Sequence, residues 1–338
     1  MNRRTWTSVA PGLLALTLCV LAVTVPVPMV ALGPGPTYDT LGDVANTPVV
    51  KVDGLPTFPT TGHLNMTTVS VTADLTLFNV IGYWMASDHG VVPRDSVYPP
   101  QKSDAEVQQE NADAFTASEA NAEVAALTQL HLPTRVVVGS VVPGSPAAGL
   151  LEVGDEIVSV SGKAVDTPIA VTDALASTKP QETVPITYKR GTEQRDAQVV
   201  LATSPYGPQG MLGVRPGIEP RAGDITISLG DIGGPSAGLM FALAVIDKLT
   251  PDNIADGRFV AGTGTITQDG QVGPIGGIPY KMLGARGAGA TTFLVPAANC
   301  DEAKANAPDG LQLVKVGTLG EAVTALTALR EGKPTTSC

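Results

Sequence analysis

The first strong pattern along the chain is an apolar run without charge from Leu13 to Leu32. As a helix, this run would be about 30 Å long, the thickness of a bilayer core. Arg3 and Arg4 precede it, and the next basic residue is Lys51. Because basic residues favour the cytoplasmic side, we expect a single transmembrane helix with a cytoplasmic N-terminus and the remainder outside. The alternative is a cleaved signal peptide with Leu13–Val25 as its apolar region.

Beyond this run the pattern changes to alternation, then to helical segments. Apolar or β-branched residues at every second position of His63–Thr72 predict a strand. Asp74–Ala86 is compatible with a short helix, and Ser103–Glu106 forms a capping box before a longer helix that extends to Leu130. We expect residues 34–131 to form an N-terminal α/β segment that packs on the C-terminal domain.

Short strands, turns and one helical stretch follow from Thr134 to Ala202 and predict a β-rich unit. The C-terminal part alternates strands with helices, which predicts a mixed domain. Its clearest local signals are an apolar helix from Ser236 to Leu249 and a hairpin at Asp269-Gly270. Two capping boxes are also expected in this part, at Asn299–Glu302 and Thr318–Glu321.

Composition removes several classes of function. The 338 residues include 21 Lys and Arg against 32 Asp and Glu, a net charge of −11. An acidic chain lacks the positive field that binds phosphate backbones, so we expect no nucleic-acid partner. The histidines are only His63, His89 and His131, and neither they nor the cysteines form a zinc-like cluster. We therefore expect no metal and no cofactor.

Two cysteines form a disulfide candidate. Cys300 and Cys338 would lie outside the cytoplasm if the anchor is present, in an oxidising compartment where thiols pair. Cys19 lies within the apolar run and cannot join them. Two unrelated thiols are the alternative.

The sharpest candidate for chemistry is Ser236, which follows glycines and opens the predicted helix. Backbone N–H groups and the helix dipole there can stabilise an oxyanion. Residues 234–238 satisfy G-x-S-x-G, the pattern of α/β-hydrolases, but that triad needs a later His and none follows. His63 or His89 in a trypsin-like order lacks the matching serine context. If Ser236 is a nucleophile, we expect its base not to be His.

Lysine is the available alternative base. Lys281 is flanked by apolar residues within GPIGGIPYKMLGA. A lysine with its usual pKa near 10.4 is protonated at neutral pH, but burial lowers that pKa because it disfavours the charged form. The other lysines after Ser236 lie in polar or charge-mixed contexts and are expected to stay protonated: Lys248, Lys304, Lys315 and Lys333.

Residues 132–203 resemble a PDZ domain of the bacterial protease-associated kind. The matching residues are Val137–Val142, the turn Ser145–Leu150, Gly154–Ile157 and Gly162. The resemblance implies a groove that binds an extended peptide by strand addition. A PDZ domain that serves only as a spacer is the alternative.

Residues 210–330 resemble the proteolytic domain of Lon-type serine peptidases. Thr263–Thr267 and Gly270–Gly277 match its second block, and Lys281 falls on the catalytic lysine. Thr263 falls on a threonine that helps to position the dyad in that family. The residues that match the nucleophile motif are Gly234, Pro235, Ser236, Ala237 and Gly238.

Two positions depart from the Lon pattern. Gly234 stands where many Lon enzymes have Asp, and Pro279 stands where Lon usually has another Lys. The second change is harmless if Lys281 is the catalytic lysine. The first removes one contact that a carboxylate would make to the dyad.

The whole arrangement resembles membrane-anchored, ATP-independent Lon-like proteases. No G-x-x-x-x-G-K-[ST] motif occurs, so we expect no ATP. The resemblance implies a serine endopeptidase that cleaves unfolded or exposed segments of protein or peptide substrates, and a homo-oligomer, since Lon domains form rings. A non-catalytic, PDZ-containing membrane adaptor is the alternative. The expected α+β chain has four parts: a cytoplasmic tip and transmembrane anchor (1–33), the N-terminal segment (34–131), a PDZ domain (132–203) and a Lon-like domain (204–338).

Overall fold

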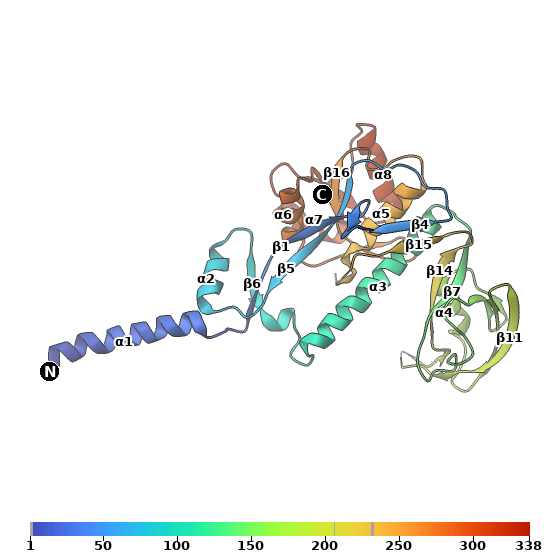
Figure 1. The fold of residues 1–338 in the computed structure, drawn as a ribbon, viewed down its shortest axis with the longest axis horizontal. Coiled ribbons are helices and arrows are strands. Elements are labelled where there is room, and N and C mark those ends of the chain that lie inside the picture. Colours follow the sequence, from blue (N-terminus) through green and yellow to red (C-terminus); the bar gives the residue numbers. More distant parts are fainter. Residues whose placement is uncertain (1–2, 206, 231–232) are drawn as a thin grey trace.

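The computed structural model describes residues 3–205, 207–230 and 233–338. Residues 1–2 of the expected cytoplasmic tip, residue 206 of the expected Lon-like domain and residues 231–232 of its Gly-rich turn lie outside the described residues. Figure 1 shows a larger α/β body and a smaller β-rich body, joined by the long helix α3 (Asp104–Gln129). Helices α1 (Arg3–Thr24) and α2 (Leu77–Met85) project from the larger body on the side away from the smaller one.

The larger body is built on a sheet in the order β20-β19-β16-β5-β1-β6. The central strand β5 (His63–Thr72) pairs in parallel with β16 (Phe259–Gly262) and antiparallel with β1 (Met29–Asp39). Strands from both ends of the chain therefore share one sheet. The remaining strands of this sheet are β6 (Gly90–Pro93), β19 (Thr292–Pro296) and β20 (Gln312–Val316).

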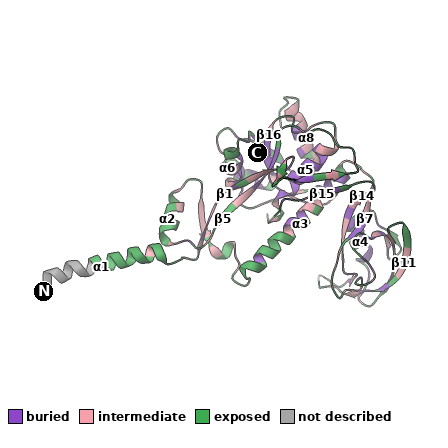
Figure 2. Cartoon of the chain, viewed as in Figure 1, coloured by how far each residue is buried: buried purple, intermediate pink, exposed green. Residues whose placement is uncertain are grey.

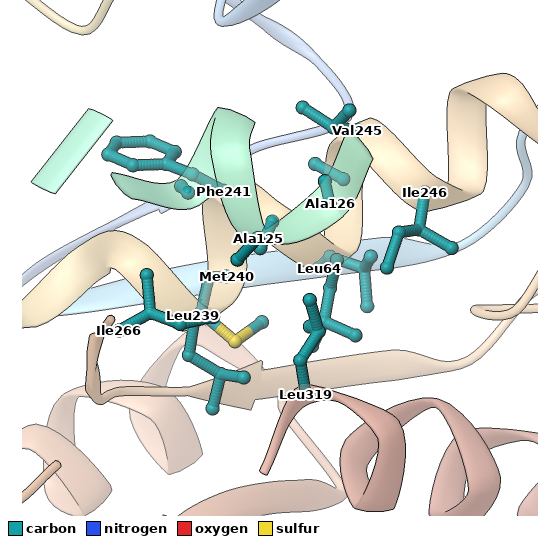
Figure 3. Close-up of a cluster of buried hydrophobic side chains, with 14 of the residues drawn as sticks. Leu64, Ala125, Ala126, Leu239, Met240, Phe241, Val245, Ile246, Ile266 and Leu319 are labelled. Atoms are coloured by element: carbon teal, nitrogen blue, oxygen red, sulfur yellow. The ribbon is translucent and has the colours of Figure 1, made fainter. Parts of the chain in front are cut away.

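Helices cover both faces of this sheet. Successive side chains of a strand point to opposite faces, so Phe293 and Val295 of β19 join the cluster of α6 and α7, while Leu294 joins that of α3, α5 and α8. Figure 3 shows the second cluster, in which Leu64 of β5 lies among the side chains of α5. The helices are α5 (Gly238–Leu249), α6 (Ile278–Ala288), α7 (Cys300–Ala305) and α8 (Leu319–Arg330).

The smaller body is a sheet in the order β11-β10-β8-β7-β14 with one short helix. β14 (Val214–Pro220) pairs antiparallel with β7 (Thr134–Val141), so residues beyond 203 complete this sheet. The chain then continues into β15 (Asp224–Ile227), which pairs with β4 (Val50–Asp53) of the larger body. The other elements are β8 (Glu156–Val160), β9 (Lys163–Ala164), α4 (Pro168–Leu175), β10 (Thr183–Arg190) and β11 (Glu193–Val200).

Short elements complete the described chain. The predicted hairpin at residues 269–270 is confirmed, because β17 (Thr265–Ile266) pairs antiparallel with β18 (Val272–Gly273). The remaining pieces are β2 (Asp43–Val44), β3 (Thr47–Pro48), β12 (Ala202–Thr203), β13 (Gly210–Met211), η1 (Arg94–Ser96), η2 (Pro235–Ala237) and η3 (Ala297–Asn299).

The three predicted helix caps have different outcomes. The capping box of Ser103 is confirmed at the start of α3. Thr318 also caps α8, since its side chain accepts a hydrogen bond from the N–H of Glu321. The box at Asn299–Glu302 is wrong, because the Asn299 side chain makes no cap bond to α7 and bonds to the backbone of Ile275 instead.

The predicted transmembrane helix over Leu13–Leu32 is wrong. Helix α1 ends before Pro26 and Pro28, which lack the N–H that continues a helix. The chain then forms β1, where Val30 and Ala31 are buried in the larger sheet. In Figure 2 the described part of α1 is, by contrast, mostly exposed. Among the helices of the described residues, none is both long enough and apolar enough to cross a bilayer. The predicted single-pass membrane localisation depended on this helix and is therefore also wrong.

A disulfide joins Cys300, at the start of α7, to Cys338 at the C-terminus. The tail that carries Cys338 also pairs with β20, where the N–H of Lys315 donates to the carbonyl of Thr336. Cys19 is free and exposed. The disulfide therefore closes a covalent loop of the chain that contains β20 and α8.

Removing this disulfide is expected to destabilise the larger body. The cysteines are separated by 38 residues, and loop-closure entropy for that length gives up to about 4 kcal/mol. Urea unfolding of Cys338→Ser should show a loss of about 2–4 kcal/mol in the free energy of unfolding. Cys19→Ser is the matched control and should leave it unchanged; equal values for all three proteins would contradict the prediction.

Candidate active site

The two candidate catalytic side chains come from helices on opposite faces of the larger sheet. Ser236 lies in η2, directly before α5, and Lys281 lies in the first turn of α6. The Nζ atom of Lys281 is 2.9 Å from the Oγ atom of Ser236, although 45 residues separate them. The structure therefore brings together the pair that the sequence predicts.

The pair meets where β16 ends. The last paired residue of β16 is Gly262, opposite Met66, so Thr67 is the first residue of β5 beyond that pairing. The amine of Lys281 donates a hydrogen bond of 2.8 Å to the Thr67 carbonyl. Sequence reasoning missed Thr67, because this contact spans 214 residues and the strand carries no local functional signal.

Burial changes the acidity of the Lys281 amine. The residue is only 4% exposed, and desolvation lowers its pKa to about 8, because burial disfavours the charged form. At pH 7 about a tenth of this amine is therefore neutral, against less than about a thousandth for a lysine with its usual pKa, and a neutral amine can accept a proton. Burial also lowers the pKa of Lys248, which the sequence placed among the ordinary protonated lysines.

Two hydrogen bonds to its carbonyl fix the backbone of Ser236. Its carbonyl accepts a hydrogen bond of 2.8 Å from the N–H of Gly264 and one of 3.0 Å from the hydroxyl of Thr263. Thr263 is fully buried. Ala237 and Gly238 are buried directly behind the serine, where α5 begins. Thr263 thus contacts the backbone of the candidate nucleophile and not the amine.

Helix α3 holds the turn that precedes Ser236. The N–H of Gly234 donates 2.8 Å to the carbonyl of Asn111, and the hydroxyl of Ser118 donates 3.0 Å to the carbonyl of Pro235. Gly234 has φ +93° and ψ 153°, a conformation almost confined to glycine. The departure from the Lon pattern at this position therefore accompanies a backbone that a side chain would strain. Sequence reasoning did not find Asn111 or Ser118.

A pocket of about 600 Å³ opens beside the dyad. One wall is formed by Met66, Thr68 and Val69 of β5, another by residues 233–237, and a third by the loop 274–276. Beyond Met66, β5 pairs with β1 on one edge; on the other, no strand of the described residues pairs with it. The disulfide cysteines line no part of this pocket.

Two stretches of the chain match known families. Residues 106–201 match the PDZ domain, and residues 229–328 match the Lon protease (S16) C-terminal proteolytic domain. These matches confirm both resemblances at the level of the domains.

Parts of the chain are also similar to individual known proteins. Lon protease 1 of Sorangium cellulosum is 40% identical over 100 residues, which are 29% of this chain and 12% of that protein. Lon protease 2 of Herpetosiphon aurantiacus is 52% identical over 66 residues, 20% of this chain and 8% of that protein. The crystallised PDZ domain of an SdrC-like protein from Listeria monocytogenes is 33% identical in the matched region. That match covers 24% of this chain and 84% of the crystallised chain, with a TM-score of 0.22. The matched stretches thus cover only about a tenth of each of these Lon proteases.

The acidity of Lys281 can be measured directly. In protein labelled with ¹³C at lysine Cε, one resonance should titrate with a midpoint near 8, because desolvation lowers its pKa to about 8. Lys281→Met identifies that resonance by removing it. A Lys281 midpoint above about 10, the usual lysine range, would contradict the burial argument.

Proposed function

We propose that this chain is a serine endopeptidase in which Ser236 is the nucleophile and Lys281 is the general base. The observation that carries the proposal is the 2.9 Å approach of a buried amine to the serine hydroxyl. A serine hydroxyl is a weak nucleophile unless a neighbouring base removes its proton. A lysine with a pKa of about 8 can do so near neutral pH.

The reaction follows from these positions. As the Ser236 oxygen bonds to the peptide carbonyl carbon, its proton passes to the neutral amine of Lys281. The resulting ammonium gives that proton to the leaving nitrogen as the C–N bond breaks. A water then hydrolyses the acyl-enzyme, with the same amine as base. The carbonyl of Thr67 accepts one N–H of this amine and so directs it toward the serine.

The oxyanion needs donors beside the serine. Residues 236 and 237 lie in the first turn of the η2–α5 helical segment, where backbone N–H groups have no preceding helical carbonyl to bond. We assign the oxyanion to these N–H groups, in the manner of other acyl-transfer sites. The bonds to the Ser236 carbonyl from Gly264 and Thr263 hold this turn in place.

The substrate we propose is an unfolded or exposed protein segment. No strand of the described residues pairs with the outer edge of β5 beyond Met66, which borders the pocket, so an extended chain can add to this edge, as in other cases of strand addition. Recognition by the PDZ domain and independence from ATP belong to the same proposal. A ring-forming homo-oligomer stays a prediction of the Lon resemblance.

Substitution of the dyad tests this proposal. The purified chain should hydrolyse casein without ATP, and Ser236→Ala or Lys281→Met should reduce the rate by more than about a thousandfold, since members of a catalytic unit act together. The exposed residues Ser87 and Lys163 provide the matched controls Ser87→Ala and Lys163→Met, which should keep full activity. Equal hydrolysis by wild type and Ser236→Ala would disprove the nucleophile. A folded wild type without any activity would favour the non-catalytic adaptor.

A further inference from the structure

The loop 274–277, which leads into α6, is not fixed by a side-chain cap at the start of that helix. Pro274, Ile275 and Gly276 line the catalytic pocket, and Gly277 precedes the helix that carries Lys281. Gly277 has φ +70°, and α6 has no side-chain cap at its N-terminus. Glycines lose more conformational freedom on folding than other residues. The position of this loop therefore depends on contacts from outside it.

Asn299 supplies such a contact. Its Oδ1 accepts a hydrogen bond from the N–H of Ile275, and its Nδ2 donates one to the carbonyl of Ile275, both at 2.9 Å. Two bonds to both backbone groups of one residue fix its orientation as well as its position. Asn299 is 7% exposed, so water competes little for these bonds.

Asn299 is itself held on both sides. It closes η3, which directly follows β19, and all five residues of β19 are buried in the larger sheet. The next residue, Cys300, is bonded to Cys338. The side chain that holds the catalytic loop therefore projects from a fixed part of the domain.

We propose that Asn299 is a positioning residue for the dyad, acting through Ile275 on the loop 274–277 and the first turn of α6. The inference rests on the proposed peptidase function. Without the two bonds, the loop shifts, the Lys281 amine loses its approach to Ser236, and water reaches the amine. Misplacement of a catalytic group by about 1 Å can cost about a hundredfold in rate.

The test compares Asn299→Leu, which keeps the approximate volume without hydrogen bonds, with Asn299→Asp, which keeps the acceptor for the Ile275 N–H but places a charged oxygen instead of a donor against the Ile275 carbonyl. Asn306→Leu is the matched control, because Asn306 lies at the end of α7, is exposed, and its side chain donates to the carbonyl of Glu302 in its own helix. In peptide hydrolysis, kcat should fall by about tenfold or more in Asn299→Leu, with KM within about threefold. The midpoint of the pH–kcat curve should rise, since water at the amine restores an ordinary lysine pKa.

A purely structural role would lower the melting temperature without moving that midpoint. Unchanged kcat and midpoint in both folded Asn299 variants would overturn the inference while leaving the peptidase proposal intact. Hydrogen exchange of residues 274–281 gives a second readout that needs no activity. Exchange should be at least about tenfold faster in the Asn299 variants than in Asn306→Leu; equal protection would overturn the inference, even in a chain that cleaves nothing.

Discussion

The buried amine of Lys281 is the point on which the site depends. Parallel strands need crossover connections, and the β16–α6–β19 crossover puts α6 on one face of the sheet while α5 lies on the other. The two helices can meet only beyond the end of a strand. β16 ends at Gly262, which leaves the carbonyl of Thr67 to hold the amine beside Ser236. Lowering the lysine pKa to about 8 corresponds to about 3 kcal/mol against the charged form.

Helix α3 links this site to the PDZ domain. One face of the helix packs on α5 and holds the turn before the nucleophile through Ser118 and Asn111. Its C-terminal end leads into β7, which pairs with β14. The chain then returns through β15 to the catalytic turn. The two connections between the bodies thus both lead to the backbone around Ser236.

Local patterns and resemblance predicted the pair Ser236 and Lys281, and the shortage of histidine directed attention to Lys281 as the candidate base. The hydropathy pattern of Leu13–Leu32 led to the wrong prediction of a transmembrane helix. An apolar run that is divided between a helix and a buried strand has the same hydropathy as a membrane span. The capping motif wrongly predicted that the Asn299 side chain caps α7. That side chain instead hydrogen-bonds to the backbone N–H and carbonyl of Ile275. Thr67 carries no local signal, since its role arises only from where a neighbouring strand ends.

The central claim is that burial makes Lys281 a base for Ser236. It is tested most directly by the rate at which a fluorophosphonate labels Ser236 as a function of pH, followed by mass spectrometry of the intact chain. The account predicts that labelling rises with pH through a midpoint near 8, the pKa of the buried amine, and that Lys281→Met abolishes this rise. Labelling that is independent of pH, or unchanged in Lys281→Met, would contradict it.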